Sequence, residues 1–360
     1  MSKIKLFDPY IDKSEGIAVR RVLDSHFWAS GAGIGKVQEF EKAFLKYTES
    51  KNCVALNSGT AALSLALSMC DIKNKEVILP SLSFVSTANA IIENGGIPKF
   101  VDIDESTLCI DPEKISKAIS KKTKVILPVH FGGTVLNLAN ISKLCKEYKI
   151  HLVEDAAHAA GSSYRNKKIG SHGEFVCFSF HPVKNLAMPT GGLISINRSD
   201  HKKVTRILKE KRWCGITNRK DVYYDVKNIG WNYYMNEFSA AIGLAQLKKL
   251  DKTNNQRKKI ARKYSNEISL ENKMLFDKEC SYHFYWIRVK NRTKFRKKLS
   301  EKGIETGIHY KPIHTFSFYK SKIRLPITEY VGKDIVTLPT HPNITEDDIE
   351  KIIKTVNNSI

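Results

Sequence analysis

Short apolar segments alternate with helical segments between residues 51 and 197, and this alternation constrains the fold more than any other feature of the chain. Strands are expected at Asn52–Leu56, Val77–Leu79, Lys99–Ile103, Val125–Val129, Leu152–Glu154, Phe175–Phe180 and Leu193–Ile196. Helices are expected at Thr60–Met69, Val85–Glu93, Glu113–Ile119, Leu138–Tyr148 and Asp200–Lys209. Short buried strands that alternate with helices are typical of a mostly parallel sheet covered on both faces. The pattern therefore predicts an α/β fold.

The character of the chain changes near residue 250. A long helix is expected to begin at Glu237 and could continue to Lys263, with a break near Asp251. Beyond it, we expect a strand at Tyr282–Val289, a basic helix at Arg292–Lys302 and a final helix at Glu346–Val356. A chain of 360 residues is long enough for roughly two domains. We therefore predict a large domain at residues 1–250 and a smaller C-terminal α+β domain at residues 251–360.

Composition is that of an ordinary soluble protein, with 42% hydrophobic and 27% charged residues. No run of about 18 apolar residues exists, so no membrane span is expected. The first residues lack the apolar run of a signal peptide, which favours a cytoplasmic location. The seven cysteines are scattered without a Cys-x-x-Cys pair, so neither a metal site nor a disulfide framework is expected.

The net charge of +22 arises from 59 basic and 37 acidic residues. Such a charge is compatible with nucleic-acid binding, or with a field that attracts phosphorylated substrates. It is also what lysine-rich solvated surfaces produce. The basic residues are spread along the whole chain and form no arginine-rich arm, which favours the last interpretation.

A possible phosphate site follows the first expected strand, where Asn57-Ser58-Gly59-Thr60 leads into an alanine- and leucine-rich helix. Backbone N–H groups at a helix start carry partial positive charge and hold phosphate well. The hydroxyl of Ser58 or Thr60 can add a donor. Serine and threonine are also common helix N-caps, so capping alone is an alternative explanation.

Another candidate follows the second expected strand, where Phe84 lies in the segment Pro80–Thr87. Ligands of open α/β folds bind at the carboxyl ends of the strands, and a flat ring there could stack on a planar cofactor. An ordinary core aromatic is the alternative.

An acid and a lysine each follow a later strand. Asp155 ends an apolar strand, with His158 three residues later, and Lys184 follows Ser179 in the next loop. A pyridoxal phosphate (PLP) enzyme needs this pair, because a lysine amine forms a Schiff base with the cofactor aldehyde and a carboxylate keeps the pyridine nitrogen protonated. Each residue alone could be an N-cap or a surface lysine. Together they predict a PLP site at one edge of the sheet.

In this order, the motifs resemble those of the sugar aminotransferases of the DegT/DnrJ/EryC1/StrS group, which belong to the aspartate aminotransferase fold class. The resemblance covers nearly the whole chain. The segments that carry it are Trp28–Gly31, Val37–Glu41, Ser58–Leu63, Glu154–His158, Ser179–Lys184, Asn232–Leu250, Gly303–Ile304 and His309–His314. It implies the fold type I of PLP-dependent transferases, with a large domain and a smaller C-terminal domain.

The resemblance also implies roles. Lys184 would form the Schiff base and move protons, and Asp155 would pair with the pyridine nitrogen. His158 would support the phenolate oxygen, and Phe84 would stack on the ring.

Further roles concern the phosphate and the substrate. Gly59, Thr60 and Ser179 would hold the phosphate, and Asn232 would reach it from the neighbouring subunit of a homodimer with shared active sites. His309, Tyr310 and His314 lie in a segment similar to the family's substrate-facing loop.

Two departures from the family pattern affect the substrate prediction. The family often has an arginine two residues after the asparagine, where this chain has Tyr234, and Leu186–Gly192 replaces a more usual Thr-Gly-Glu-Gly-Gly ending. A proline beside the lysine loop could reshape the acceptor pocket.

The leading hypothesis is an aminotransferase that moves nitrogen from an amino acid, with L-glutamate favoured, to a nucleotide-linked 3- or 4-keto-6-deoxy sugar. The departures leave open a small phosphorylated ketone or a cyclitol ketone as acceptor. A non-catalytic regulatory or nucleic-acid-binding protein on this fold is the remote alternative, supported only by the charge.

Overall fold

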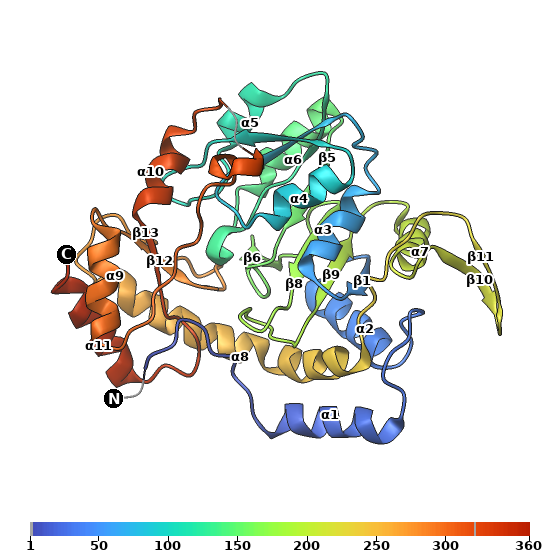
Figure 1. Cartoon of the computed structure of the whole chain (residues 1–360), viewed down its shortest axis with the longest axis horizontal. Helices are drawn as coiled ribbons and strands as arrows, with labels where there is room; N and C mark the ends of the chain where they lie inside the picture. Colours follow the sequence, from blue (N-terminus) through green and yellow to red (C-terminus); the bar gives the residue numbers. More distant parts are fainter. Residues whose placement is uncertain (1–2, 320–321) are drawn as a thin grey trace.

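Seven strands form one sheet at the centre of the molecule (Figure 1). The structure, a computed structural model, describes residues 3–319 and 322–360. In sheet order the strands are β1 (Asn52–Leu56), β9 (Gly192–Ile196), β8 (Phe175–Ser179), β5 (His151–Asp155), β4 (Thr123–Ile126), β2 (Glu76–Pro80) and β3 (Ile97–Val101). Strand β9 runs opposite to the other six strands of this sheet. The predicted mostly parallel sheet is confirmed.

Both faces of the sheet are buried. Because successive side chains of a strand point to opposite sides, each strand contributes to two apolar clusters. In β2, for example, Val77 and Leu79 enter one apolar cluster and Ile78 enters the other. The first cluster is covered by α3 (Gly59–Leu67), α4 (Ser86–Glu93) and α7 (His201–Lys211). The second is covered by α2 (Lys36–Thr48), α5 (Pro112–Ala118), α6 (Leu138–Tyr148) and α8 (Glu237–Glu267). Two cores explain why the strands have continuous apolar runs.

The C-terminal part is an α+β unit, as predicted. It contains the antiparallel pair β12 (Tyr285–Arg288) and β13 (Ile335–Leu338), with α9 (Arg292–Glu301), α10 (Pro326–Asp334) and α11 (Glu346–Asn357). These elements lie together on the left of Figure 1. The N-terminal segment returns to this unit, where Ile4 forms a bridge with Ile304.

Helix α8 is one continuous helix of 31 residues, so the break expected near Asp251 is wrong. The side chains at Leu250, Thr253 and Asn254 are buried, which shows that the inward face continues through this position. The predicted domain boundary at residue 250 falls inside the helix, and the division into domains stays a prediction.

The remaining elements lie outside the sheet. They are α1 (Lys13–Ser25), the hairpin of β6 (Ser163–Tyr164) and β7 (Lys167–Lys168), the hairpin of β10 (Ile216–Lys220) and β11 (Tyr223–Val226), and short 3-10 turns at Phe131–Gly133, Ile313–Thr315 and Ser317–Tyr319. The β10–β11 hairpin projects away from the body on the right of Figure 1. No helix in the described part of the chain is long and apolar enough to cross a bilayer.

A buried arginine joins three of these elements. The Arg212 side chain follows α7 and is fully buried. Its Nη1 donates to Glu41 Oε1 of α2 at 2.6 Å and to the carbonyl of Ala55 in β1 at 3.0 Å. Its Nη2 donates to the carbonyl of Ala32 at 2.9 Å. Without the guanidinium, the Ala32 carbonyl would lose this donor, and Glu41 would keep only Lys209 and the Ala55 N–H.

We therefore expect Arg212→Met to lower the free energy of unfolding by about 2 kcal/mol, because buried hydrogen bonds are lost and the Glu41 carboxylate keeps only one of its two cationic partners. Urea unfolding followed by circular dichroism measures the change. The control is Arg206→Met, which removes an exposed arginine whose Nε lies 4.0 Å from Glu210 and should change stability by less than about 0.5 kcal/mol. Equal effects of the two substitutions would contradict this role of Arg212.

Candidate functional site

Ten of the predicted site residues line one cavity of about 430 Å³. They come from the segments that follow β1, β2, β5 and β8 and from the loop after α9, and they are Ser58, Gly59, Thr60, Phe84, Asp155, His158, Ser179, Lys184, His309 and Tyr310. Because the carboxyl ends of β2, β5 and β8 meet at one edge of the sheet, residues far apart in sequence converge there.

The N-terminus of α3 opens into this cavity. Ser58 is its N-cap, and the Ser58 side chain accepts a hydrogen bond from the Ala61 N–H at 3.1 Å. A Cβ atom on Gly59 would lie 2.7 Å from Ser179 Cβ, and one on Gly192 would lie 2.1 Å from the Ser58 carbonyl oxygen. Glycine is therefore required for this close approach between the helix start and the ends of β8 and β9. The N–H groups at this end could hold a phosphate.

Asp155 lies at the end of β5 and is 4% exposed. Burial raises the pKa of this carboxyl group, while hydrogen bonds from Thr87 and Ala157 oppose that change. The Thr87 hydroxyl donates to Oδ2 at 2.8 Å and the Ala157 N–H donates to Oδ1 at 3.1 Å. These bonds fix the carboxylate in a place where a cationic ring nitrogen would be its natural partner.

Lys184 lies in the loop between β8 and β9. The loop is held by two backbone hydrogen bonds, from Lys184 N–H to the His181 carbonyl and from Met188 N–H to the Phe180 carbonyl, both 2.8 Å long. Burial lowers the pKa of Lys184 to about 8, and the negative charge of Asp155 opposes this shift. A lysine in such a site has a substantial neutral fraction near pH 8, as a nucleophile or general base requires.

His158 is held as one neutral tautomer. Burial, followed by the charge of Lys184, lowers the pKa of His158 far below its usual value. The Gly132 N–H donates to His158 Nδ1 at 3.3 Å, so Nδ1 is an acceptor and the ring proton is on Nε2. Nε2 lies 3.1 Å from the Tyr310 hydroxyl oxygen, which then accepts. The Tyr310 O–H proton is consequently free to point elsewhere.

Aromatic side chains form the rest of the wall. The Phe84 ring is 5.9 Å from the Tyr310 ring, and 56% of its surface is exposed, so it is not a core aromatic. Burial raises the pKa of Tyr310, which keeps the phenol protonated. Burial lowers the pKa of His309 to about 4, and its Nδ1 lies 2.8 Å from the Thr337 hydroxyl.

Two predicted site residues do not line the cavity. His314 is buried instead, with Nδ1 at 2.7 Å from Ser81 Oγ and its backbone N–H donating to the same oxygen at 3.0 Å. It supports the end of β2 and is not placed to touch a substrate. Asn232 is exposed, and its carbonyl accepts from Asn57 Nδ2 at 3.2 Å.

The structure adds three residues that were not predicted as site residues. Phe7 lines the cavity and stacks on His283, with ring centroids 5.1 Å apart. His283 in turn stacks on His158 at 4.6 Å, which completes a column of rings behind the site. Thr87 is the hydroxyl partner of Asp155. Only Thr87 had a sequence signal, because it lies one turn beyond Phe84 in the segment that follows β2.

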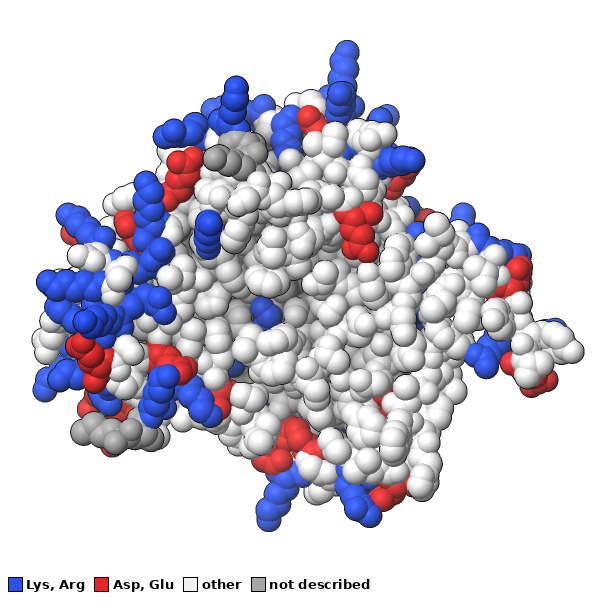
Figure 2. Space-filling view, viewed as in Figure 1, with Lys and Arg blue, Asp and Glu red and all other residues white. Residues whose placement is uncertain are grey.

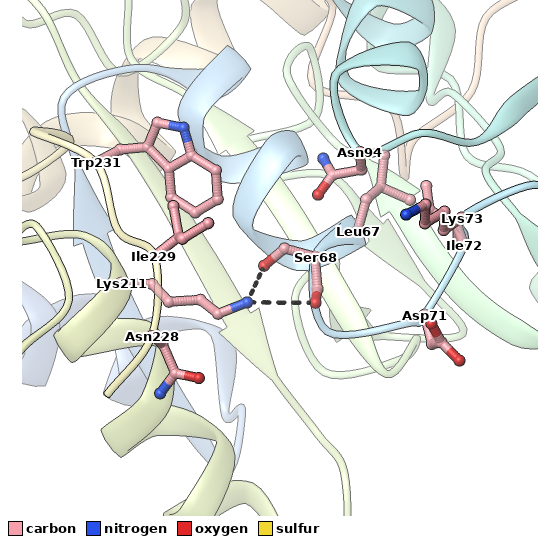
Figure 3. A pocket seen from close by; sticks show the side chains of 10 residues that line it. All are labelled: Leu67, Ser68, Asp71, Ile72, Lys73, Asn94, Lys211, Asn228, Ile229 and Trp231. Atoms are coloured by element: carbon pink, nitrogen blue, oxygen red, sulfur yellow. Dashed lines mark hydrogen bonds between the residues drawn. The ribbon is translucent and has the colours of Figure 1, made fainter. Parts of the chain in front are cut away.

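A smaller hollow of about 310 Å³ lies at the opposite end of α3 (Figure 3). Lys211 crosses it and donates to the Ser68 carbonyl at 3.4 Å and to Ser68 Oγ at 3.0 Å. Burial lowers the pKa of this lysine too. Its contacts are those of a cation at a helix C-terminus, and no predicted site residue lines this hollow.

The residues of the larger cavity fit PLP. The α3 N-terminus and Ser179 supply donors for a phosphate, Asp155 supplies a fixed carboxylate, and Lys184 supplies an amine with a lowered pKa. In the described part of the chain, no group of three or more histidine, cysteine, aspartate or glutamate side chains is arranged to bind a metal ion.

Comparisons with known proteins identify the family and the fold of the chain. Residues 9–357 match the model of the DegT/DnrJ/EryC1/StrS aminotransferase family. The chain is 33% identical to the spore coat polysaccharide biosynthesis protein SpsC of Bacillus subtilis over 371 aligned residues. The alignment covers 97% of this chain and 95% of that relative.

Solved structures of sugar aminotransferases have the same fold as this chain. PseC of Helicobacter pylori, an aminotransferase involved in the biosynthesis of pseudoaminic acid, has a TM-score of 0.93 at 28% identity over 99% of both chains. The PLP form of the putative sugar aminotransferase Spr1654 of Streptococcus pneumoniae has a TM-score of 0.93 at 27% identity, over 99% of this chain and 98% of that chain. The predicted fold type I is confirmed. The chain therefore belongs to the DegT/DnrJ/EryC1/StrS aminotransferase family and is a PLP-dependent aminotransferase.

Proposed function

We propose that this enzyme moves an amino group from L-glutamate to a keto sugar carried on a nucleotide, in the cytoplasm. The observation that carries the proposal is the single cavity in which Lys184, Asp155 and the start of α3 meet. Relatives with related structures are named for sugar and polysaccharide biosynthesis, which supports a sugar acceptor. The family resemblance supports L-glutamate and the nucleotide carrier.

Each side chain has a proposed part in the reaction. When bound, PLP supplies an electron sink for the carbon that loses its proton. Asp155 holds the pyridine nitrogen in its protonated state, and its own burial strengthens this pairing. Ser58, Gly59, Thr60 and Ser179 hold the phosphate, and the Phe84 ring covers one face of the cofactor.

Lys184 is the proposed proton shuttle. Its neutral amine would accept the proton that the α-carbon of the donor loses, and the resulting ammonium would later give that proton back. The His158 Nε2–H, which here points to the Tyr310 hydroxyl oxygen, would be shared with the phenolate oxygen of a bound cofactor. The free O–H of Tyr310 and the neutral ring of His309 are proposed to contact the acceptor, and His314, which supports β2, is not.

The alternative acceptors have less support. A small phosphorylated ketone or a cyclitol ketone was suggested by the altered Leu186–Gly192 segment and by Tyr234. Leu186, Ala187 and Met188 are buried, and Pro189 does not line the cavity. Thr190 and Gly191 of the same segment do line it. The altered segment and the position of Tyr234 therefore still leave these acceptors open. An acceptor panel decides between the classes, because turnover confined to nucleotide-linked sugars would exclude the smaller ketones.

We propose a homodimer with shared active sites. The β10–β11 hairpin exposes Val222 and Tyr223 by more than three quarters, and Ile229 is 82% exposed. A second copy of the chain would cover this apolar surface. Asn232 lies three residues after Ile229 and does not line the cavity of its own chain. This position supports a contact between Asn232 and the active site of the neighbouring subunit.

The dimer proposal predicts that Val222→Asp converts a dimer into a monomer and lowers activity, because a charge is placed inside the interface. Sedimentation velocity of the purified protein measures the state. Leu275→Asp is a matched control, since Leu275 is 64% exposed elsewhere on the surface. A monomeric parent protein with full activity would end the proposal.

The shuttle proposal predicts that Lys184→Ala lowers turnover at least about 100-fold, as loss of a general acid–base does. Steady-state turnover with glutamate and the best acceptor measures it. Lys211→Met is the control, because Lys211 is another partly buried lysine whose pKa is lowered but which lines only the hollow of Figure 3. If Lys184→Ala kept full activity, the proposed mechanism would be refuted.

The lowered pKa of Lys184 predicts a pH dependence for cofactor capture by PLP-free protein. Burial favours the neutral amine, so the rate should rise with pH through a midpoint near pH 8 and level off at higher pH. In Asp155→Ala the opposing negative charge is absent, and the midpoint should move to lower pH. Stopped-flow absorbance measures the rate, and a midpoint near 10.4, the value of an ordinary lysine, would show that Lys184 is not desolvated.

A further inference from the structure

A second concave surface, which we call the α8 groove, lies on the outer face of the C-terminal half of α8. Its volume is about 490 Å³, within the size range of small-ligand sites. Its basic residues are Lys258, Lys259, Arg262 and Lys263 of α8 and Lys278 of the following loop. The groove shares no residue with the PLP cavity.

The helix period places these cations together. Lys258 and Arg262 are one turn apart, as are Lys259 and Lys263, so the four form two adjacent rows on one face. The opposite face of α8 carries the buried residues Arg257, Ile260, Ala261 and Tyr264. The charged face is therefore held rigidly by the core rather than by a mobile loop.

Most of this charge is not neutralised. Lys263 pairs with Glu346 at 2.5 Å. In residues 3–319 and 322–360, no carboxylate lies within ion-pair distance of the other four cations, and no acidic residue lines the groove. Cations gathered in a concave surface without acids attract anions more strongly than the same charges on a flat surface.

Two contacts fix the cationic groups. Lys258 Nζ donates to the Lys278 carbonyl at 2.6 Å, and the Arg262 guanidinium lies 4.5 Å from the centre of the Phe276 ring. Burial lowers the pKa of Lys258, and the charge of Lys168 lowers it further, while Asp251 and Asp277 oppose this shift. A bound anion would relieve the repulsion between these cations. Asn255 and Asn266 also line the groove and add amide donors.

We propose that the α8 groove binds a small ligand that carries several phosphate groups. Lysine and arginine together suit such a ligand, because ammonium and guanidinium groups form strong charge-assisted hydrogen bonds with phosphate oxygens. A ligand with a single charge would leave most of the cations uncompensated. The limited size of the groove favours a small oligophosphate over a nucleic-acid strand, which would need a longer basic path.

Helix α9 provides a natural comparison within the same chain. Lys294 and Lys297 are exposed there, and the C-terminal elements form a dense basic area on the left of Figure 2. Neither lysine lines a cavity among the pockets described above. The α9 surface has the charge of the α8 groove without its shape.

The test is isothermal titration calorimetry of the PLP-loaded protein with sodium tripolyphosphate, so that the phosphate site of the PLP cavity is already filled. We expect saturable binding of one tripolyphosphate per chain, with orthophosphate at least about tenfold weaker because it meets fewer cations. Lys259→Glu/Lys278→Glu should weaken tripolyphosphate binding at least about tenfold, since two charged contacts are lost. Both lysines are exposed, so folding should be unaffected, and a thermal melt checks this.

The matched control is Lys294→Glu/Lys297→Glu, which changes the net charge equally on α9 and should alter the affinity less than about twofold. Arg262→Gln is a second groove variant without charge reversal, and it should also weaken binding. The proposal is overturned by an absence of saturable binding, by equal losses in the α8 and α9 variants, or by unchanged affinity in both. Tighter binding of single-stranded RNA, with a steep salt dependence, would assign the surface to nucleic acid instead.

Discussion

The proximity of a partly buried lysine and a buried carboxylate governs the chemistry that this protein can perform. Burial disfavours the charged form of both Lys184 and Asp155, and it moves their pKa values toward each other. Their mutual attraction opposes this change without cancelling it. The lysine therefore stays available as a neutral amine, and the carboxylate is left in need of a cationic partner. A pyridinium ring meets that need, which is why the pair fits PLP.

The fold provides the burial that this pair requires. The sheet has two covered faces, and the cavity at its carboxyl edge is walled mainly by the segments that follow its strands. Gly59 and Gly192 let the start of α3 approach β8 and β9 closely, at the place where a phosphate would lie. The rings of Phe7, His283 and His158 fill the space behind it. Stability and function thus depend on the same packing.

Sequence patterns predicted the sheet, most of its helices and twelve site residues, ten of which line one cavity. Eight of the ten lie at or after the end of an apolar strand, which is a local feature, whereas His309 and Tyr310 were predicted only from their motif. Phe7 and His283 could not be found in this way, since they reach the site only through tertiary packing of the N-terminal and C-terminal segments. His314 was placed among substrate contacts by motif, but its bonds to Ser81 turn it inward. The break predicted near Asp251 does not occur, because the Asp251 side chain is exposed, pairs with Lys168 and does not interrupt the helix.

The most direct test of the central claim is the absorption spectrum of the purified, PLP-loaded protein before and after addition of L-glutamate. The account predicts a band of bound PLP that falls as the band of the pyridoxamine form rises, in the parent protein and not in Lys184→Ala. A bound-cofactor band that L-glutamate leaves unchanged would contradict the proposed donor. No cofactor band, even after added PLP, would contradict the assignment of this cavity as the cofactor site.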